Sequence, residues 1–196
     1  FEDTQLAFRR RLVLEQIAAH QPASLLEVGC GMLPLFLDLD AGLDVTIVEP
    51  SVEFARHARQ FAQGRSVRVI ERFLEDIAMP LREGGYDFIV VSSLLHEVER
   101  PERLLGMLRQ HCHDRTVLHV NVPNALSLHR LLAVEMGLIE DPFTLSSTQR
   151  RMQQNSTFDL GSLVELLNSE GFEVIGKASY FIKPFTHAQM QALFDS

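Results

Sequence analysis

The sequence lacks the features that mark several common classes of protein. No apolar stretch approaches the roughly 18 residues that a membrane-spanning helix needs, and no repeat or low-complexity tract is visible. The chain has two cysteines, Cys30 and Cys112, and their spacing fits neither a metal site nor a redox pair. We therefore expect free thiols and a cytoplasmic protein without a membrane anchor. The sequence does not indicate an oligomeric state.

Positive charge is also scarce. Lysine and arginine total 18 against 26 aspartate and glutamate residues, which gives a formal net charge of −8. A general nucleic-acid-binding surface is basic, so we expect no nucleic-acid partner, whereas a small cationic ligand is compatible with this charge. With 196 residues, of which 46% are hydrophobic, the chain is long enough for one domain with a sizeable core. We expect a single domain over residues 1–196.

Apolar runs of strand length alternate with helical patterns along most of the chain. The expected strands are 24–28, 44–50, 67–71, 86–95, 116–123 and 172–181. The expected helices are 2–20, 34–40, 51–62, 101–112 and 159–170. The strand cores are fully apolar, as in a parallel sheet that is buried on both faces. The pattern predicts an α/β fold, a doubly wound, mostly parallel sheet with helices on both faces, which binds ligands beyond the carboxyl ends of its strands.

A glycine turn, Gly29-Cys30-Gly31, follows the first expected strand. The dinucleotide fingerprint would need a third glycine at position 34, where this chain has Pro34. Glu27, beside the turn, is a poor neighbour for a pyrophosphate and a good one for an ammonium group. Glu49 ends the second strand, where an acid commonly accepts hydrogen bonds from both ribose hydroxyls. The ligand is therefore expected to be a nucleoside with a cationic tail and no phosphates, a description that S-adenosylmethionine meets.

The chain resembles the class I S-adenosylmethionine-dependent methyltransferases, and the small-molecule O-methyltransferases of quinone and natural-product pathways are the most similar. The stretches that carry the resemblance are Glu27-x-Gly29-x-Gly31, Glu49-Pro50, "FLEDIAM", "YDFIVVSSLLHEVERPERLL" and "VNVPNALSLHR". It implies a Rossmann-like fold and S-adenosyl-L-methionine as the cofactor. The family often has a third glycine at position 33, where this chain has Leu33. The family also usually ends with a seventh, antiparallel strand, and no strand pattern follows "THAQMQALF".

The same resemblance and the strand ends predict the site residues. The expected cofactor-binding residues are Glu27, Gly29, Gly31, Glu49, Pro50, Glu75, Asp76, Ser92 and Ser93. The expected residues on the acceptor side are His96, Asn121 and Asn124, with His129 as the catalytic residue. Most have a plainer interpretation as well: Glu75 and Asp76 as helix-capping acids, Asn124 as a turn residue, and His129 as a packing residue.

Two further motifs carry charged side chains. His96-Glu97 is half of a metal motif, but no histidine follows four residues later, so no metal is expected. The run Arg9-Arg10-Arg11 is expected to form a solvated helix face, although one guanidinium could reach the cofactor carboxylate.

The connection from residue 124 to residue 157 is longer than an ordinary loop, and such insertions are usually functional. Four apolar residues at helical spacing predict a helix that Asp141-Pro142 ends; they are Leu128, Leu131, Leu132 and Met136. We expect the segment to be a helical cap that folds over the crevice and forms the acceptor pocket.

The predicted activity is methyl transfer from S-adenosylmethionine to an oxygen or nitrogen of a small molecule. For a hydroxyl acceptor, neutral His129 would take the proton, since the usual histidine pKa of about 6.5 suits a base near neutral pH. Two alternatives remain open. The first is an enzyme in which the cofactor's own amine attacks its side chain and releases methylthioadenosine. The second is a non-catalytic cofactor-binding subunit.

Overall fold

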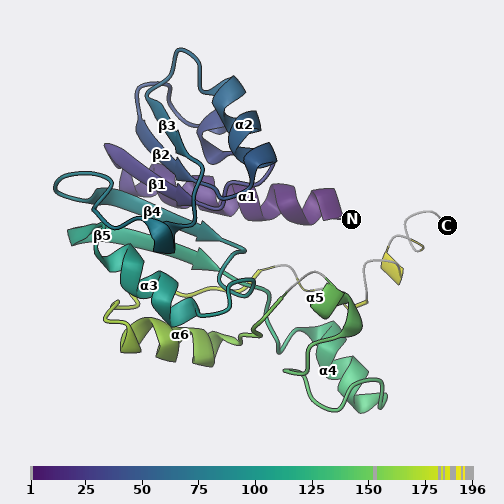
Figure 1. The fold of residues 1–196 in the computed structure, drawn as a ribbon. Coiled ribbons are helices and arrows are strands. Elements are labelled where there is room, and N and C mark those ends of the chain that lie inside the picture. The colour runs from purple at the N-terminus through teal and green to yellow at the C-terminus, as the bar shows by residue number, and fades with distance from the viewer. Residues whose placement is uncertain are drawn as a thin grey trace. The chain divides into compact units, whose positions relative to one another are not determined.

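The chain forms two compact units. The computed structural model describes residues 2–151, 154–180, 182, 184–185, 189–190 and 192. One unit, here called the sheet unit, comprises Arg10–Leu95 and Arg100–Asn121, and the other, here called the second unit, comprises Phe1–Arg9, His96–Glu99 and Val122–Ser196. Figure 1 shows the ribbon with its helices and strands labelled. No described helix has the length and apolar character needed to cross a membrane.

The sheet unit contains one parallel sheet of five strands in the order β3-β2-β1-β4-β5. The strands are β1 Ser24–Val28, β2 Asp44–Val48, β3 Val67–Ile70, β4 Tyr86–Ser92 and β5 Cys112–Asn121. This order confirms the predicted doubly wound fold, because the strands run outward in both directions from β1. The switch point therefore lies between β1 and β4, whose register pairs Glu27 with Val90.

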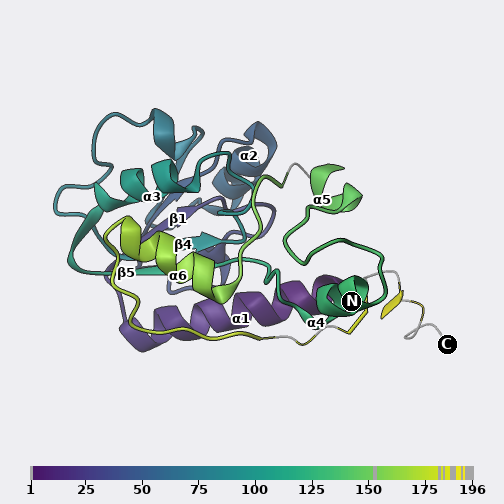
Figure 2. The same ribbon diagram turned by 90° about the horizontal axis from the view of Figure 1, so that it is seen from below.

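Helices cover both faces of the sheet. In one core cluster, Val13 and Ile17 of α1 (Glu2–His20) and Ala58 of α2 (Val52–Phe61) are buried with Leu25 and Ile47 of the sheet. The leucines of α3 (Pro101–Arg109) are fully buried as well, and Figure 2 shows α1 and α3 on opposite sides of the sheet. Burial of one such leucine stabilises the fold by about 2 kcal/mol.

Local sequence signals set the helix boundaries. Ser51 precedes α2, and its hydroxyl accepts a hydrogen bond from the Phe54 N–H at 3.4 Å, as predicted. Pro101 begins α3 at a position where its missing N–H costs nothing. The short helix predicted after the glycine turn is the 3-10 turn η1 (Leu35–Asp38), with Pro34 directly before it. Pro34 therefore lies one position before the observed helix, whereas the expected helix, 34–40, included it.

The prediction for Cys112 was wrong. This residue begins β5 and does not end α3. Cys112 of β5 pairs with Tyr86 of β4. The register between the two strands then shifts, and the next pair is Val117 of β5 with Phe88 of β4. The polar stretch at the start of β5 joins the sheet through this irregular pairing with β4. The helical spacing of the apolar residues up to Cys112, on which the prediction rested, carries no sign of such a pairing.

Beyond the start of α1, the second unit carries the helices α4 Leu128–Glu135, α5 Ser147–Arg151 and α6 Leu160–Ser169. The segment that carries α4 and α5 closes on itself, because the Ala125 N–H donates to the Phe158 carbonyl at 2.7 Å. Arg130 ties its interior together through hydrogen bonds to the carbonyls of Pro142 and Thr144, both at 2.6 Å. Asp159 caps α6 through a reciprocal pair of bonds with Ser162.

Two predictions for the second unit were wrong. Helix α4 ends at Glu135, before the expected break at Asp141-Pro142, because Gly137 has a φ of 66° and directs the chain out of the helix. Residues 172–180 do not form the expected sixth strand. Alternating apolar residues form a strand only when a neighbouring strand accepts their hydrogen bonds, and Ile175 in this stretch is 74% exposed. The residues after "THAQMQALF", 195 and 196, lie outside the described residues.

Candidate cofactor and acceptor site

The glycine turn follows β1 as predicted and needs both of its glycines. Gly29 has a φ of 75° and Gly31 a φ of 55°, which are left-handed conformations that side chains disfavour. A Cβ on Gly29 would lie 3.3 Å from the Leu94 side chain. A Cβ on Gly31 would meet no atom within 4 Å, so the space beside its backbone is open. The turn therefore exposes backbone to whatever binds there.

Glu49 holds the turn against the end of β2. Its side chain is buried, and its carboxylate accepts hydrogen bonds from the Gly31 N–H at 3.2 Å and the Ser51 N–H at 2.9 Å. Each carboxylate oxygen can accept a further hydrogen bond. Glu49 is thus oriented by backbone groups and keeps the capacity to accept hydroxyl donors, while the neighbouring Pro50 is exposed.

Glu27 lies deeper, on the adjacent strand β1. Its carboxylate oxygens accept the Leu35 N–H at 3.2 and 3.0 Å. Burial raises the pKa of Glu27 to about 8; the Leu35 hydrogen bond and the Arg10 charge lower it, and the Glu49 charge raises it. Burial and the two glutamates also raise the pKa of the Cys30 thiol, so this cysteine stays protonated. The environment of Glu27 therefore favours a cationic ligand that would compensate its charge.

Ser92, Ser93 and Asn121 form one hydrogen-bonded group at the ends of β4 and β5. The Asn121 amide donates to the Ser92 hydroxyl at 2.9 Å, and the Ser93 N–H donates to the Asn121 side-chain oxygen at 3.1 Å. Ser93 has a φ of 55°, which is strained for a residue with a side chain. The predicted cofactor-side serines and the predicted acceptor-side asparagine thus share one network, joined by His119, whose Nε2 lies 3.4 Å from the Asn121 amide nitrogen.

Glu75 and Asp76 lie in a second 3-10 turn, η2 (Leu74–Asp76), after β3. Glu75 is half-buried and Asp76 is exposed. The N-cap position of this turn is Phe73, and no side-chain hydrogen bond caps it. The acids are therefore available for a ligand, and the capping interpretation has no support in the turn itself.

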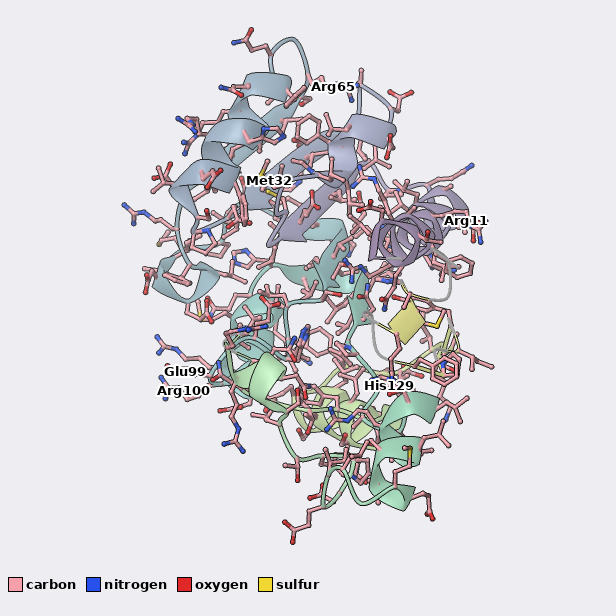
Figure 3. The ribbon with its side chains drawn as sticks, turned by 90° about the vertical axis from the view of Figure 1, so that its right-hand side faces the viewer. Arg11, Met32, Arg65, Glu99, Arg100 and His129 are labelled. Carbon is pink, nitrogen blue, oxygen red and sulfur yellow. The ribbon has the colours of Figure 1, made fainter. Side chains whose placement is uncertain are left out.

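The remaining acceptor-side candidates belong to the second unit. His96 is 4% exposed, and its Nδ1 has no hydrogen-bond partner among the described residues. Burial, together with the Arg9 charge, lowers the pKa of His96 to about 4. Asn124 accepts the Leu126 N–H at 2.9 Å, as a turn residue does. His129, on α4, has its Nδ1 3.1 Å from the Ser127 hydroxyl (Figure 3). His96 is neutral near pH 7, which leaves its ring able to accept or donate a hydrogen bond.

The expected solvated face of Arg9-Arg10-Arg11 is wrong for Arg10, whereas the alternative, that one of these guanidiniums reaches the cofactor carboxylate, stays a prediction. The Arg10 side chain is 16% exposed and contacts the segment after the glycine turn. Arg11 does have the expected exposure, at 60%, and extends outward from α1 in Figure 3. Two of the three partners of Arg10 are backbone carbonyls and the third is the Asp38 carboxylate, so the sequence offered little to single out this arginine.

The groups assembled in the sheet unit fit S-adenosylmethionine. Two buried carboxylates with spare acceptor capacity suit ribose hydroxyls and an ammonium group, and the open space beside Gly31 admits a ligand against the backbone. Among the described residues, no three or more His, Cys, Asp or Glu side chains are grouped to hold a metal ion.

Comparison with known proteins agrees with this fit. Residues 3–177 match a family model described as a methyltransferase domain. No curated protein matches the chain.

Several solved structures share the fold. The plantazolicin methyltransferase BpumL, in complex with a triazolic desmethylPZN analog and SAH, is 19% identical with a TM-score of 0.63, over 86% of this chain and 65% of that one. A S-adenosylmethionine-dependent methyltransferase from Clostridium acetobutylicum ATCC 824 is 15% identical with a TM-score of 0.52, over 63% and 52%. The [4+2]-cyclase SpnF is 19% identical with a TM-score of 0.61, over 79% and 53%.

This chain spans less than two thirds of the length of each of these three proteins. At such identities the likeness concerns the fold, whereas the family model covers most of the chain. The chain belongs to the methyltransferase domain family, with the class I fold and S-adenosylmethionine as its cofactor.

Proposed function

We propose that this protein transfers a methyl group from S-adenosylmethionine to an oxygen or nitrogen of a small molecule. The observation that carries the proposal is the pair of buried carboxylates, Glu27 and Glu49, at the ends of adjacent strands. Backbone N–H groups orient both carboxylates. Such a pair suits a nucleoside with a cationic tail and disfavours a phosphate. The bound cofactor supplies a methyl group on a sulfonium, which is already an activated leaving group.

The residues of the sheet unit would bind and orient the cofactor. Glu49 would accept the ribose hydroxyls, and Glu27 would face the ammonium end. Gly29 and Gly31 would let the ligand approach the backbone. Glu75 or Asp76 would contact the adenine amino group, and Pro50, Ser92 and Ser93 would line the site. Alignment of the two reactants and exclusion of water then account for most of the rate.

His129 is proposed as the general base for a hydroxyl acceptor. The Ser127 hydroxyl lies within hydrogen-bond distance of its Nδ1 and would fix the orientation of the ring. His96, Asn121 and Asn124 are proposed to contact the acceptor. A His129→Ala variant should keep its cofactor affinity and lose turnover with hydroxyl acceptors by about 10²-fold or more. Unchanged turnover would leave His129 with a packing role.

The experiment that tests the function is incubation with S-adenosylmethionine, alone and with a metabolite library, followed by mass spectrometry. Acceptor-dependent formation of S-adenosylhomocysteine and a product heavier by one methylene supports the proposal. Methylthioadenosine formed without an acceptor would indicate attack of the cofactor's amine on its own chain. Cofactor binding without either product, across the library, would instead favour a non-catalytic subunit. The Glu49→Ala variant serves as the control for turnover that depends on this site.

A further inference from the structure

The segment after the glycine turn, residues 33–39, is held by two arginine side chains. Arg10 of α1 donates to the Leu33 carbonyl at 2.5 Å, to the Pro34 carbonyl at 2.7 Å and to the Asp38 carboxylate at 2.6 Å. All three nitrogens of its guanidinium are therefore engaged.

Arg65, which follows α2, holds the other end of the same segment. It donates to the Phe36 carbonyl at 2.7 Å and to the Leu39 carbonyl at 3.2 Å. Its guanidinium also lies 5.7 Å from the centre of the Phe36 ring. Met32, directly before the segment, and Arg65 are both labelled in Figure 3. The two arginines thus make the same kind of contact with the segment from two different elements.

Only one of the two arginines acts on Glu27 as well. Leu35, in the middle of the segment, donates its N–H to the Glu27 carboxylate, and Arg10 holds the chain on both sides of this donor, at Leu33 and Pro34 before it and at Asp38 after it. The Arg10 charge also lowers the pKa of Glu27, against burial and against the Glu49 charge. Cys30, the other titratable group that interacts with Glu27, stays protonated. Arg65 does not contribute to the pKa shift of Glu27.

We propose that Arg10 is a positioning residue for the cofactor, which holds residues 33–38 and the Glu27 carboxylate in the arrangement that accepts the ammonium end of S-adenosylmethionine. The inference rests on the proposed role of Glu27 in cofactor binding. Arg10 acts through Glu27 and the Leu35 N–H and is not itself assigned a contact with the cofactor. Arg65 stabilises the same segment without this role.

The test compares two ligands that differ at the amino-acid end. S-adenosylhomocysteine carries the ammonium and carboxylate groups, and methylthioadenosine lacks both. Calorimetry with Arg10→Met should show S-adenosylhomocysteine binding weakened by about tenfold, as expected when a charged hydrogen-bonding site is misplaced. Methylthioadenosine affinity should stay within about twofold of the wild-type value. Arg65→Met, the matched control, should change both affinities by the same small factor.

Equal losses for both ligands in Arg10→Met, or the same pattern in both variants, would show that Arg10 is only a structural contact and would overturn the proposal. If Arg10→Met has no cooperative melting transition, Arg10→Lys replaces it, because lysine keeps the charge but cannot donate in the same fork. Arg10→Lys should likewise weaken the binding of S-adenosylhomocysteine and leave the binding of methylthioadenosine nearly unchanged. A wild-type protein that binds methylthioadenosine and S-adenosylhomocysteine equally would overturn the role of Glu27, whereas one that binds neither would overturn the proposed function.

Discussion

Cofactor binding near pH 7 should release a proton from Glu27. Burial raises the pKa of this carboxyl to about 8 in the protein without ligand, although the Leu35 N–H and the Arg10 charge lower it. A carboxyl with this pKa is about 90% protonated at pH 7. An ammonium group placed beside it favours the ionised form and lowers the pKa by about 2 units. The protonated fraction then falls to about 10%, so about 0.8 proton leaves per ligand bound.

The same numbers give the strength of the interaction. A pKa decrease of about 2 units corresponds to about 2.7 kcal/mol of attraction between ligand and ionised carboxylate. In the protein without ligand, burial makes ionisation of Glu27 unfavourable, so this residue affects the pH dependence of folding stability. Because the folded pKa is raised above the ordinary value of 4.5, the contribution of Glu27 to stability is complete below that value. It is lost as the pH rises through about 8.

The assay is titration calorimetry with S-adenosylhomocysteine at pH 7 in buffers with different ionisation enthalpies. The dependence of the measured enthalpy on the buffer gives the number of protons exchanged. Glu27→Gln is the matched control, since glutamine keeps the shape of the side chain and cannot ionise. Any proton exchanged by the ligand's own amine is the same in both proteins and cancels in the comparison. If wild type and Glu27→Gln bind the ligand and exchange equal numbers of protons, Glu27 does not change its charge and the reasoning fails.

Three further predictions concern single positions. Glu49→Ala should weaken S-adenosylmethionine binding by roughly 1.5–3 kcal/mol, because charged hydrogen bonds to the ribose are lost, and calorimetry would measure it; an unchanged affinity would remove Glu49 from the site. Gly31→Val should fold with a lower melting temperature, because a Cβ there meets no atom within 4 Å but a φ of 55° is strained for valine. Unlike wild type, the variant should not gain melting temperature with the cofactor; normal binding would make the turn purely structural. Burial alone would raise the pKa of Asp87, but hydrogen bonds from Ser24, His113 and the Ala23 N–H hold it below its ordinary value. Asp87 therefore stabilises the fold above the unfolded pKa of about 3.9, and this contribution is lost as the pH falls through the lower folded pKa. Urea unfolding from pH 6 to pH 2.5 should show a smaller loss of stability for Asp87→Asn than for wild type.

Most of the sheet could be predicted from the sequence because its signals are local. Each strand core is a short apolar run, and the helix starts at the Ser51 cap and at Pro101 are recognisable from the residues around them. The elements that were predicted wrongly depend on distant partners. Cys112 joins β5 through an irregular pairing with Tyr86. Residues 172–180 have a strand pattern but no ladder.

The carboxylates of the candidate site could be predicted because residues that end parallel strands gather at one edge of the sheet. Glu27 and Glu49 are both buried at the ends of the neighbouring strands β1 and β2. The hydrogen bonds that orient these carboxylates could not be predicted. They come from the N–H groups of Leu35, Gly31 and Ser51, and any residue except proline carries such a group.

Arg10 shows why the second layer of a binding site is harder to find than the first. Its partners in residues 33–38 include two backbone carbonyls, so no side-chain pattern reports them. The sequence did carry one relevant fact, which is that Leu33 stands where the family that the chain resembles often has a glycine. The Leu33 side chain is 48% exposed, so it adds little packing that would hold the segment. The segment then needs another means to stay in place, and an arginine, with donors that diverge in a plane, can hold several carbonyls at once. A missing glycine in such a turn is therefore a reason to search the preceding helix for a buried arginine.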